Sequence, residues 1–154
     1  MHDPRLDQLA KVLVRYSNNI KRGDNALIMG AACCEPLMVA IYREVLAVGG
    51  HPWVRIFSEA CKEVHIKEGS DEQLSYTSPF DKALIDKCNA FFTLWGEDNT
   101  RAMTNADPRK FAMFSKARRP WLDALMKRSA LPRNDPKKLR WVGTQFPTNS
   151  GAQD

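Results

Sequence analysis

The sequence predicts an α/β domain built on a mostly parallel sheet of about four strands, with helices on both faces. The first observation is a strand, helix, strand pattern within residues 26–57. The apolar run at 26–29, which ends at Gly30, has the composition of a strand buried on both faces. Helical spacing follows over 36–48, and β-rich residues return at 53–57. A crossover of this length makes the two strands parallel.

The second observation is that the same alternation continues along the chain. Residues 90–95 predict an aromatic strand that ends at Gly96, and residues 139–144 predict a fourth strand after a loop at 131–138. Apolar spacing and capping residues predict helices over 4–19, 58–68, 70–73 and 79–86. The apolar side of the helix at 79–86 consists of Phe80, Ala83, Leu84 and Ile85. A long helical stretch starts at 107, with Phe111 and Phe114 among its apolar positions, and Pro120 kinks or splits it.

Length and composition indicate a single domain that needs no metal or disulfide to fold. A chain of 154 residues is about the size of one domain and buries much of its apolar surface. The four cysteines lack CxxC spacing, and residues 1–11 lack the apolar core of a signal peptide. With no apolar run of the roughly 18 residues that span a bilayer, we expect a cytoplasmic protein without membrane partners.

The net charge of +5 is concentrated in one region, because residues 101–140 hold 12 lysines or arginines against three aspartates. Such a surplus can mark a nucleic-acid interface. The region has no interleaved aromatic stacking pattern, no glycine-rich RNA motif and no zinc-finger spacing. We therefore do not expect nucleic acid as a partner, and interpret the region as a solvated helix face or a surface for an acidic partner.

The turn after the first strand contains two adjacent cysteines and no phosphate-binding motif. Neither GxGxxG nor GxxxxGK[ST] is present, which argues against a Rossmann cofactor. Cys33 and Cys34 precede a predicted helix, where a thiolate is favoured. His51 begins the second strand and is therefore expected at the opposite edge of the sheet, whereas His65 is not excluded as a base. The sequence favours packed cysteines over nucleophiles.

Carboxylates and one amide follow three successive predicted strands. No histidine has a second ligand at a recognised metal spacing, so we expect no metal site and no catalytic residue in this chain. The side chains after the strands are candidates for a substrate cleft, because open α/β sheets bind ligands at this edge. They are Glu35, Glu59, Glu97, Asp98 and Asn99. The alternative is that they are solvated loop residues and helix caps.

Five segments of the chain, in this order and spacing, together suggest a known family: DPRLDQLAKVLVRYSNNIKRGDNALI, CEPLMVAIYREVLAVGGHPWVRI, SDEQLSY, KARRPWLDALMKR and LRWVGTQFPT. On these segments the chain resembles the N-terminal portion of the thermophilic metallo-aminopeptidases, the family that includes aminopeptidase T, aminopeptidase S and PepS. The resemblance implies a cytoplasmic homodimer that acts on peptides. It also implies two divalent metal ions, zinc, cobalt or magnesium, that bind the free amine of a peptide and activate a bridging water.

The family's metal ligands follow the point that corresponds to Asp154, so none is assigned to a residue of this chain. We therefore expect residues 1–154 to be the N-terminal domain of an aminopeptidase, inactive alone because the metal-binding catalytic domain is absent. The alternative is a free-standing α/β binding or interaction module that uses the basic region at 101–140. A parent reading frame that continues into a half rich in histidine and glutamate would distinguish the peptidase from the module.

Overall fold

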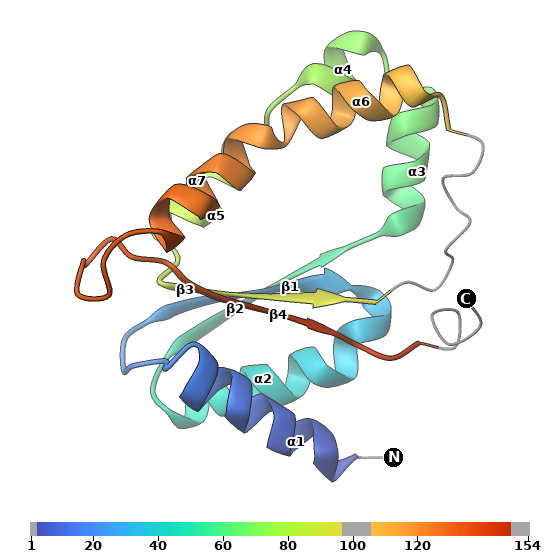
Figure 1. Cartoon of the computed structure of the whole chain (residues 1–154). Helices are drawn as coiled ribbons and strands as arrows, with labels where there is room; N and C mark the ends of the chain where they lie inside the picture. Colours follow the sequence, from blue (N-terminus) through green and yellow to red (C-terminus); the bar gives the residue numbers. More distant parts are fainter. Residues whose placement is uncertain (1–2, 97–105, 149–154) are drawn as a thin grey trace.

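The computed structural model describes residues 3–96 and 106–148, and its centre is a parallel sheet. The strands are β1 (Asn25–Ala31), β2 (His51–Phe57), β3 (Ala90–Trp95) and β4 (Arg140–Gln145). They pair in the order β2-β1-β3-β4, and every neighbouring pair is parallel (Figure 1). The predicted four-stranded parallel sheet is therefore confirmed.

Helices cover both faces of the sheet, as predicted (Figure 1). The helices of one face are α1 (Pro4–Lys11), its π-helical continuation η1 (Val12–Ser17) and α2 (Glu35–Ala47), which a 3-10 turn, η2 (Ala32–Cys34), precedes. On the other side lie α3 (Glu59–Glu68), α4 (Asp71–Ser75), α5 (Pro79–Lys87), α6 (Pro108–Ala117) and α7 (Arg119–Ser129). In the described part of the chain, none of these helices is long and apolar enough to cross a membrane.

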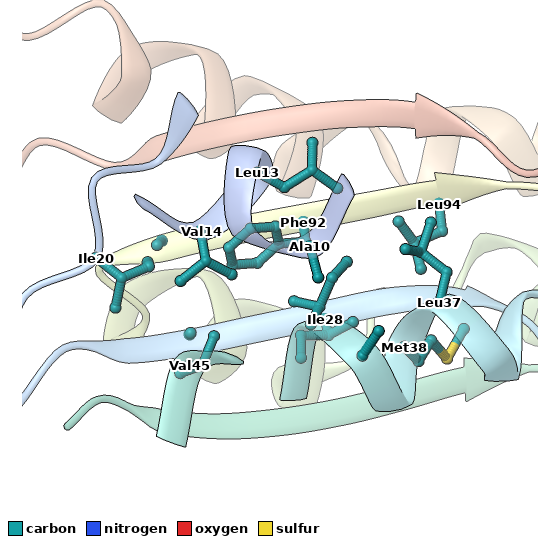
Figure 2. Packing of buried hydrophobic residues seen from close by; sticks show 14 of the residues in the cluster. Ala10, Leu13, Val14, Ile20, Ile28, Leu37, Met38, Val45, Phe92 and Leu94 are labelled. Carbon is teal, nitrogen blue, oxygen red and sulfur yellow. The ribbon is translucent and has the colours of Figure 1, made fainter. Parts of the chain in front are cut away.

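Two hydrophobic clusters hold the helices to the sheet, one on each face. Alternate residues of β1 point to opposite faces, so Ile28 packs under α2 while Leu27 faces α5 and α7. Figure 2 shows the first cluster, in which Leu94 of β3 lies beside Leu37 of α2. The second cluster includes Leu125 of α7. Burial on both faces explains why β1 has no polar side chain after Asn25.

Gly30 lies inside β1 and does not end it, so the predicted strand end at this residue is wrong. The strand continues to Ala31, and Gly30 pairs with Ile56 of β2 and Leu94 of β3. A Cβ on Gly30 would lie 2.8 Å from Cε of Met38 and 2.9 Å from the carbonyl oxygen of Leu94. The glycine is present because the helix and the neighbouring strand leave no room for a side chain, which apolar patterning does not reveal.

The first helix widens into π-helical turns that the sequence did not predict. The N–H of Asn18 donates to the carbonyl of Leu13 at 2.9 Å, the five-residue spacing of a π turn. The Asn18 side chain is fully buried, and its Nδ2 donates to the carbonyl of Phe91 at 3.0 Å. This hydrogen bond joins the end of the first helical segment to β3. Secondary-structure periodicity does not distinguish such a turn from the end of an α-helix.

The long C-terminal helical stretch is split as predicted, with α6 ending at Ala117 and Pro120 occupying the second position of α7. The expected apolar side of the helix at 79–86 is partly wrong. Ile85 is buried, but Phe80 is 78% exposed in the first turn of α5. Phe80 lies instead beside Trp53 of the edge strand, in a hollow of about 400 Å³. Among the strands of the described residues, β2 is at the edge of the sheet, and Phe80 is accessible beside it.

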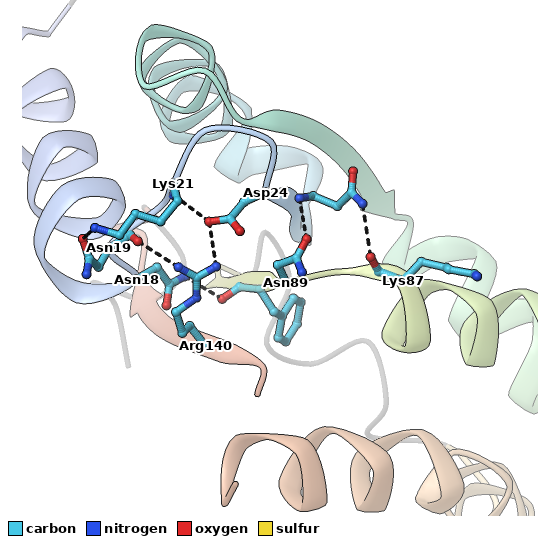
Figure 3. A network of polar contacts seen from close by, with 9 residues as sticks. Asn18, Asn19, Lys21, Asp24, Lys87, Asn89 and Arg140 are labelled. Carbon is cyan, nitrogen blue, oxygen red and sulfur yellow. Dashed lines mark hydrogen bonds and ion pairs between the residues drawn. The ribbon is translucent and has the colours of Figure 1, made fainter. Parts of the chain in front are cut away.

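A polar network fixes the amino ends of the strands (Figure 3). The Arg140 guanidinium donates from Nη1 to the carbonyl of Asn19 at 2.8 Å and from Nη2 to Oδ2 of Asp24 at 2.7 Å. The N–H of Asn25 donates to Oδ1 of Asn89 at 2.8 Å. The network joins the loop before β1 to β3 and β4. The Arg140 and Asp24 side chains are only 26% and 15% exposed, so solvent screens this ion pair less than a surface pair.

Replacing Arg140 should therefore destabilise the domain. Arg140→Ala removes both donors and leaves Asp24 half-buried without its cation, so we expect the free energy of unfolding to fall by about 1.5 to 3 kcal/mol. Urea unfolding monitored by tryptophan fluorescence measures the change. Arg133→Ala, at an exposed loop position, is the matched control and should change it by less than about 0.5 kcal/mol. Equal stability of the two variants would contradict a structural role for the network.

Cys88 should make the free energy of unfolding of the domain depend on pH in the alkaline range. Burial raises the pKa of the Cys88 thiol from 9.0 to about 11, so between these values the folded chain keeps a proton that the unfolded chain loses. The free energy of unfolding should therefore fall as pH rises through this window, by about 2 to 3 kcal/mol in total. Cys88→Ala should remove this part of the pH dependence. If the free energies of unfolding of wild type and variant changed equally with pH from pH 8 to 11, this prediction would be contradicted.

Candidate functional site

All four strands end at the same edge of the sheet, because they are parallel. After β1, the chain forms β2 on one side of β1. It forms β3 on the other side of β1 only after α3, α4 and α5. The strand order therefore reverses between β1 and β3. In open α/β sheets, ligands bind outside the carboxyl ends of the strands at such a reversal. This edge is the candidate functional site.

The structure brings two of the predicted cleft residues to this edge. Glu35 is the first residue of α2 after β1, and Glu59 is the first residue of α3 after β2. Glu35 is exposed and borders a hollow of about 290 Å³ between α2 and β2, whereas Glu59 is half-buried. Glu97, Asp98 and Asn99 lie outside the described residues. A role of these five residues in a substrate cleft remains a prediction.

The adjacent cysteines fill the space between the ends of β1 and β3. The sulfurs of Cys33 and Cys34 are 4.0 Å apart, and Cys34 Sγ donates to the carbonyl of Leu94 at 3.9 Å. A Cβ placed on Gly96 would lie 2.8 Å from Cys34 Sγ and 3.1 Å from Cys33 Sγ. Cys34 is fully buried in the first core cluster. The packing role that the sequence favoured is therefore what the structure shows for Cys34.

Neither described histidine is arranged with other ligands as a metal site. His51 pairs with Asn25 at the amino end of β1, a strand length from Cys33, so its predicted exclusion as a base is confirmed. The His65 ring packs on Phe114 of α6 with centroids 5.5 Å apart. Within residues 3–96 and 106–148, no group of three or more histidine, cysteine, aspartate or glutamate side chains is placed to hold a metal ion. The described residues therefore do not form a two-metal centre.

Much of the positive charge in the region 101–140 serves the fold. Arg109 forms an ion pair with Asp71 at 2.6 Å, and Lys110 Nζ donates to the carbonyls of Lys67 and Gly69. Arg128 donates to the carbonyls of Lys137 and Ile85, and Lys138 donates to those of Ser129 and Leu131. Arg140 forms an ion pair with Asp24. These contacts hold α6, α7 and the loop before β4 in place, and the use of the region as a surface for an acidic partner stays a prediction.

A pocket of about 530 Å³ lies between the carboxyl end of β2, α3 and α6, and we call it the basic pocket. Its basic side chains are Arg55, Lys62, His65 and Arg118. Its aromatic walls are Phe57, Phe111 and Phe114. Sequence reasoning missed this site because it treated the aromatic residues of 107–126 as an apolar helix side, whereas α6 contains no buried residue. The signal available in the sequence was the spacing of Phe111, Phe114 and Arg118, which places the three residues on one side of a helix.

Comparisons with known proteins agree with the fold. A family model described as thermophilic metalloprotease (M29) matches residues 2–154. The solved structure of wild-type AmpT from Thermus thermophilus is similar to this chain, with a TM-score of 0.75 and 15% sequence identity. The similarity covers 94% of this chain and 36% of that chain, and at this identity it shows the fold alone. No curated protein sequence matches this chain.

Proposed function

This chain belongs to the thermophilic metalloprotease (M29) family, and on that premise we propose that it is the N-terminal domain of a two-metal aminopeptidase. The whole enzyme would remove N-terminal amino acids from peptides. The observation that carries the proposal is the family match, which extends over residues 2–154. The fold shared with AmpT supports it.

The proposal assigns the metal chemistry to a part of the enzyme outside this chain. This chain spans 36% of the length of the similar AmpT chain. In such an enzyme two divalent ions, zinc, cobalt or magnesium, would supply an activated water and hold the free amine of the peptide. The residues described for this chain do not fit that centre, so we assign no catalytic step to them. We also propose that the enzyme is a cytoplasmic homodimer.

The role we propose for this domain is to form one wall of the substrate cleft. The edge that carries Glu35 and Glu59 is the edge at which open α/β sheets place ligands, and both residues begin a helix there. Carboxylates at this edge, with Glu97 and Asp98, would attract the protonated amine of a peptide. Asn99 would add a hydrogen-bonding amide. A cleft between two domains is a common position for an active site.

Activity measurements test this assignment. The 154-residue chain should not hydrolyse leucyl or other aminoacyl reporter substrates with added zinc, cobalt or magnesium, since its described residues offer no two-metal ligand set. The matched positive control is the same chain continued into a family metal-binding half, which should hydrolyse the reporters and lose activity with a chelator. Turnover by the 154-residue chain that survives repurification would overturn the assignment.

A further inference from the structure

We propose that the basic pocket binds a small organic anion, namely a carboxylate or phosphate attached to an aromatic or apolar body. The proposal goes beyond the peptidase function and does not depend on it. It rests on three properties of the pocket: exposed aromatic walls, positive charge that is not neutralised internally, and a volume suited to a small ligand.

The aromatic walls expose apolar surface inside a concave site. Phe57 at the end of β2 is 38% exposed, and Phe111 on α6 is 41% exposed. Neither ring belongs to a core cluster, although removal of a phenylalanine ring from water is favourable. Phe114 also lines the pocket, and its ring packs on the His65 ring of α3. Apolar surface that is concave and rimmed by polar groups is characteristic of ligand-binding sites.

The charge at the pocket favours an anion. Lys62 and Arg118 form no ion pair among the described residues, whereas Arg55 is paired with Asp81. No aspartate or glutamate is among the described residues that line the pocket. Two cations therefore face the hollow without a counter-charge from its walls. An arginine guanidinium and a lysine ammonium are the usual partners of carboxylate and phosphate groups.

Arg118 is also oriented for recognition. Its guanidinium carbon is 5.5 Å from the centroid of the Phe114 ring, so a cation–π contact positions it beside the aromatic wall. On the opposite side, Ser58 caps α3, and its Oγ accepts from the N–H of Cys61 at 3.2 Å. The Ser58 hydroxyl keeps a proton that it can donate, and the positive end of the α3 dipole lies at the same place. The Arg118 guanidinium and the Ser58 hydroxyl are thus two donors among the residues that line the pocket.

The volume selects a small ligand. A pocket of about 530 Å³ lies within the range of about 300 to 1,000 Å³ that is typical of small-molecule sites. A nucleic acid would need a longer track of available cations. Two of the other basic residues of α6, Arg109 and Lys110, already bind Asp71 and backbone carbonyls, and the third, Lys116, does not border the pocket. The two available cations fit one carboxylate or one phosphate.

Nuclear magnetic resonance titration of the 154-residue chain tests the proposal. The probes are N-acetylphenylalanine, which has the carboxylate of a peptide C-terminus, and phenyl phosphate, which represents a free phosphorylated compound. We expect saturable shifts of amides in residues 58–65 and 111–118 at millimolar probe concentration. Tighter binding of the first probe would indicate a peptide source, and tighter binding of the second a phosphorylated metabolite. The neutral N-acetylphenylalaninamide should bind at least about tenfold more weakly.

Matched variants separate the pocket from general surface charge. Arg118→Gln and Lys62→Gln should each weaken binding about tenfold, because each removes one charged contact. Arg119→Gln and Lys116→Gln change exposed cations that do not border the pocket, and should leave affinity unchanged. Failure of both probes to bind would overturn the proposal. Equal effects of Arg119→Gln and Arg118→Gln, or equal binding of inorganic phosphate and phenyl phosphate, would also overturn it.

Discussion

The structure depends on the burial of β1 between two neighbours and two helical layers. Because β1 pairs in parallel with both β2 and β3, its backbone polar groups are satisfied and its side chains must be apolar on both faces. The same pairing fixes the direction of every other strand. It therefore brings the carboxyl ends of β1, β2 and β3 to one edge, and it places the polar network of Asp24 and Arg140 at the other. The polar network and the candidate functional site thus lie at opposite edges of the sheet.

The carboxyl edge contains two chemically different surfaces. Near α2, Glu35 borders a small hollow, and on the other face the basic pocket opens between β2, α3 and α6. Ile56 lines both, so the end of β2 lies between Glu35 and the basic pocket. The hollow beside Glu35 is also lined by Arg43, whereas no carboxylate is among the described residues that line the basic pocket.

The sequence was sufficient for the fold and insufficient for the site. Parallel pairing, the split at Pro120 and the opposite-edge position of His51 follow from periodicity, from the geometry of proline and from strand direction. Gly30 and Phe80 were misinterpreted because their environments depend on helices and strands distant in sequence. The basic pocket was missed for the same reason. Arg55 and Arg118 are brought to one pocket only by the tertiary fold, and no spacing pattern in the sequence predicts that they lie together.

The central claim is that this member of a metalloprotease family is a domain stabilised by its own hydrophobic core. Thermal unfolding of the 154-residue chain, with and without a strong chelator such as EDTA, tests it most directly. Because the described residues form two core clusters and no metal-holding group, the two melting temperatures should coincide. A chelator-induced decrease of many degrees would show that a metal ion stabilises the fold and would contradict the account.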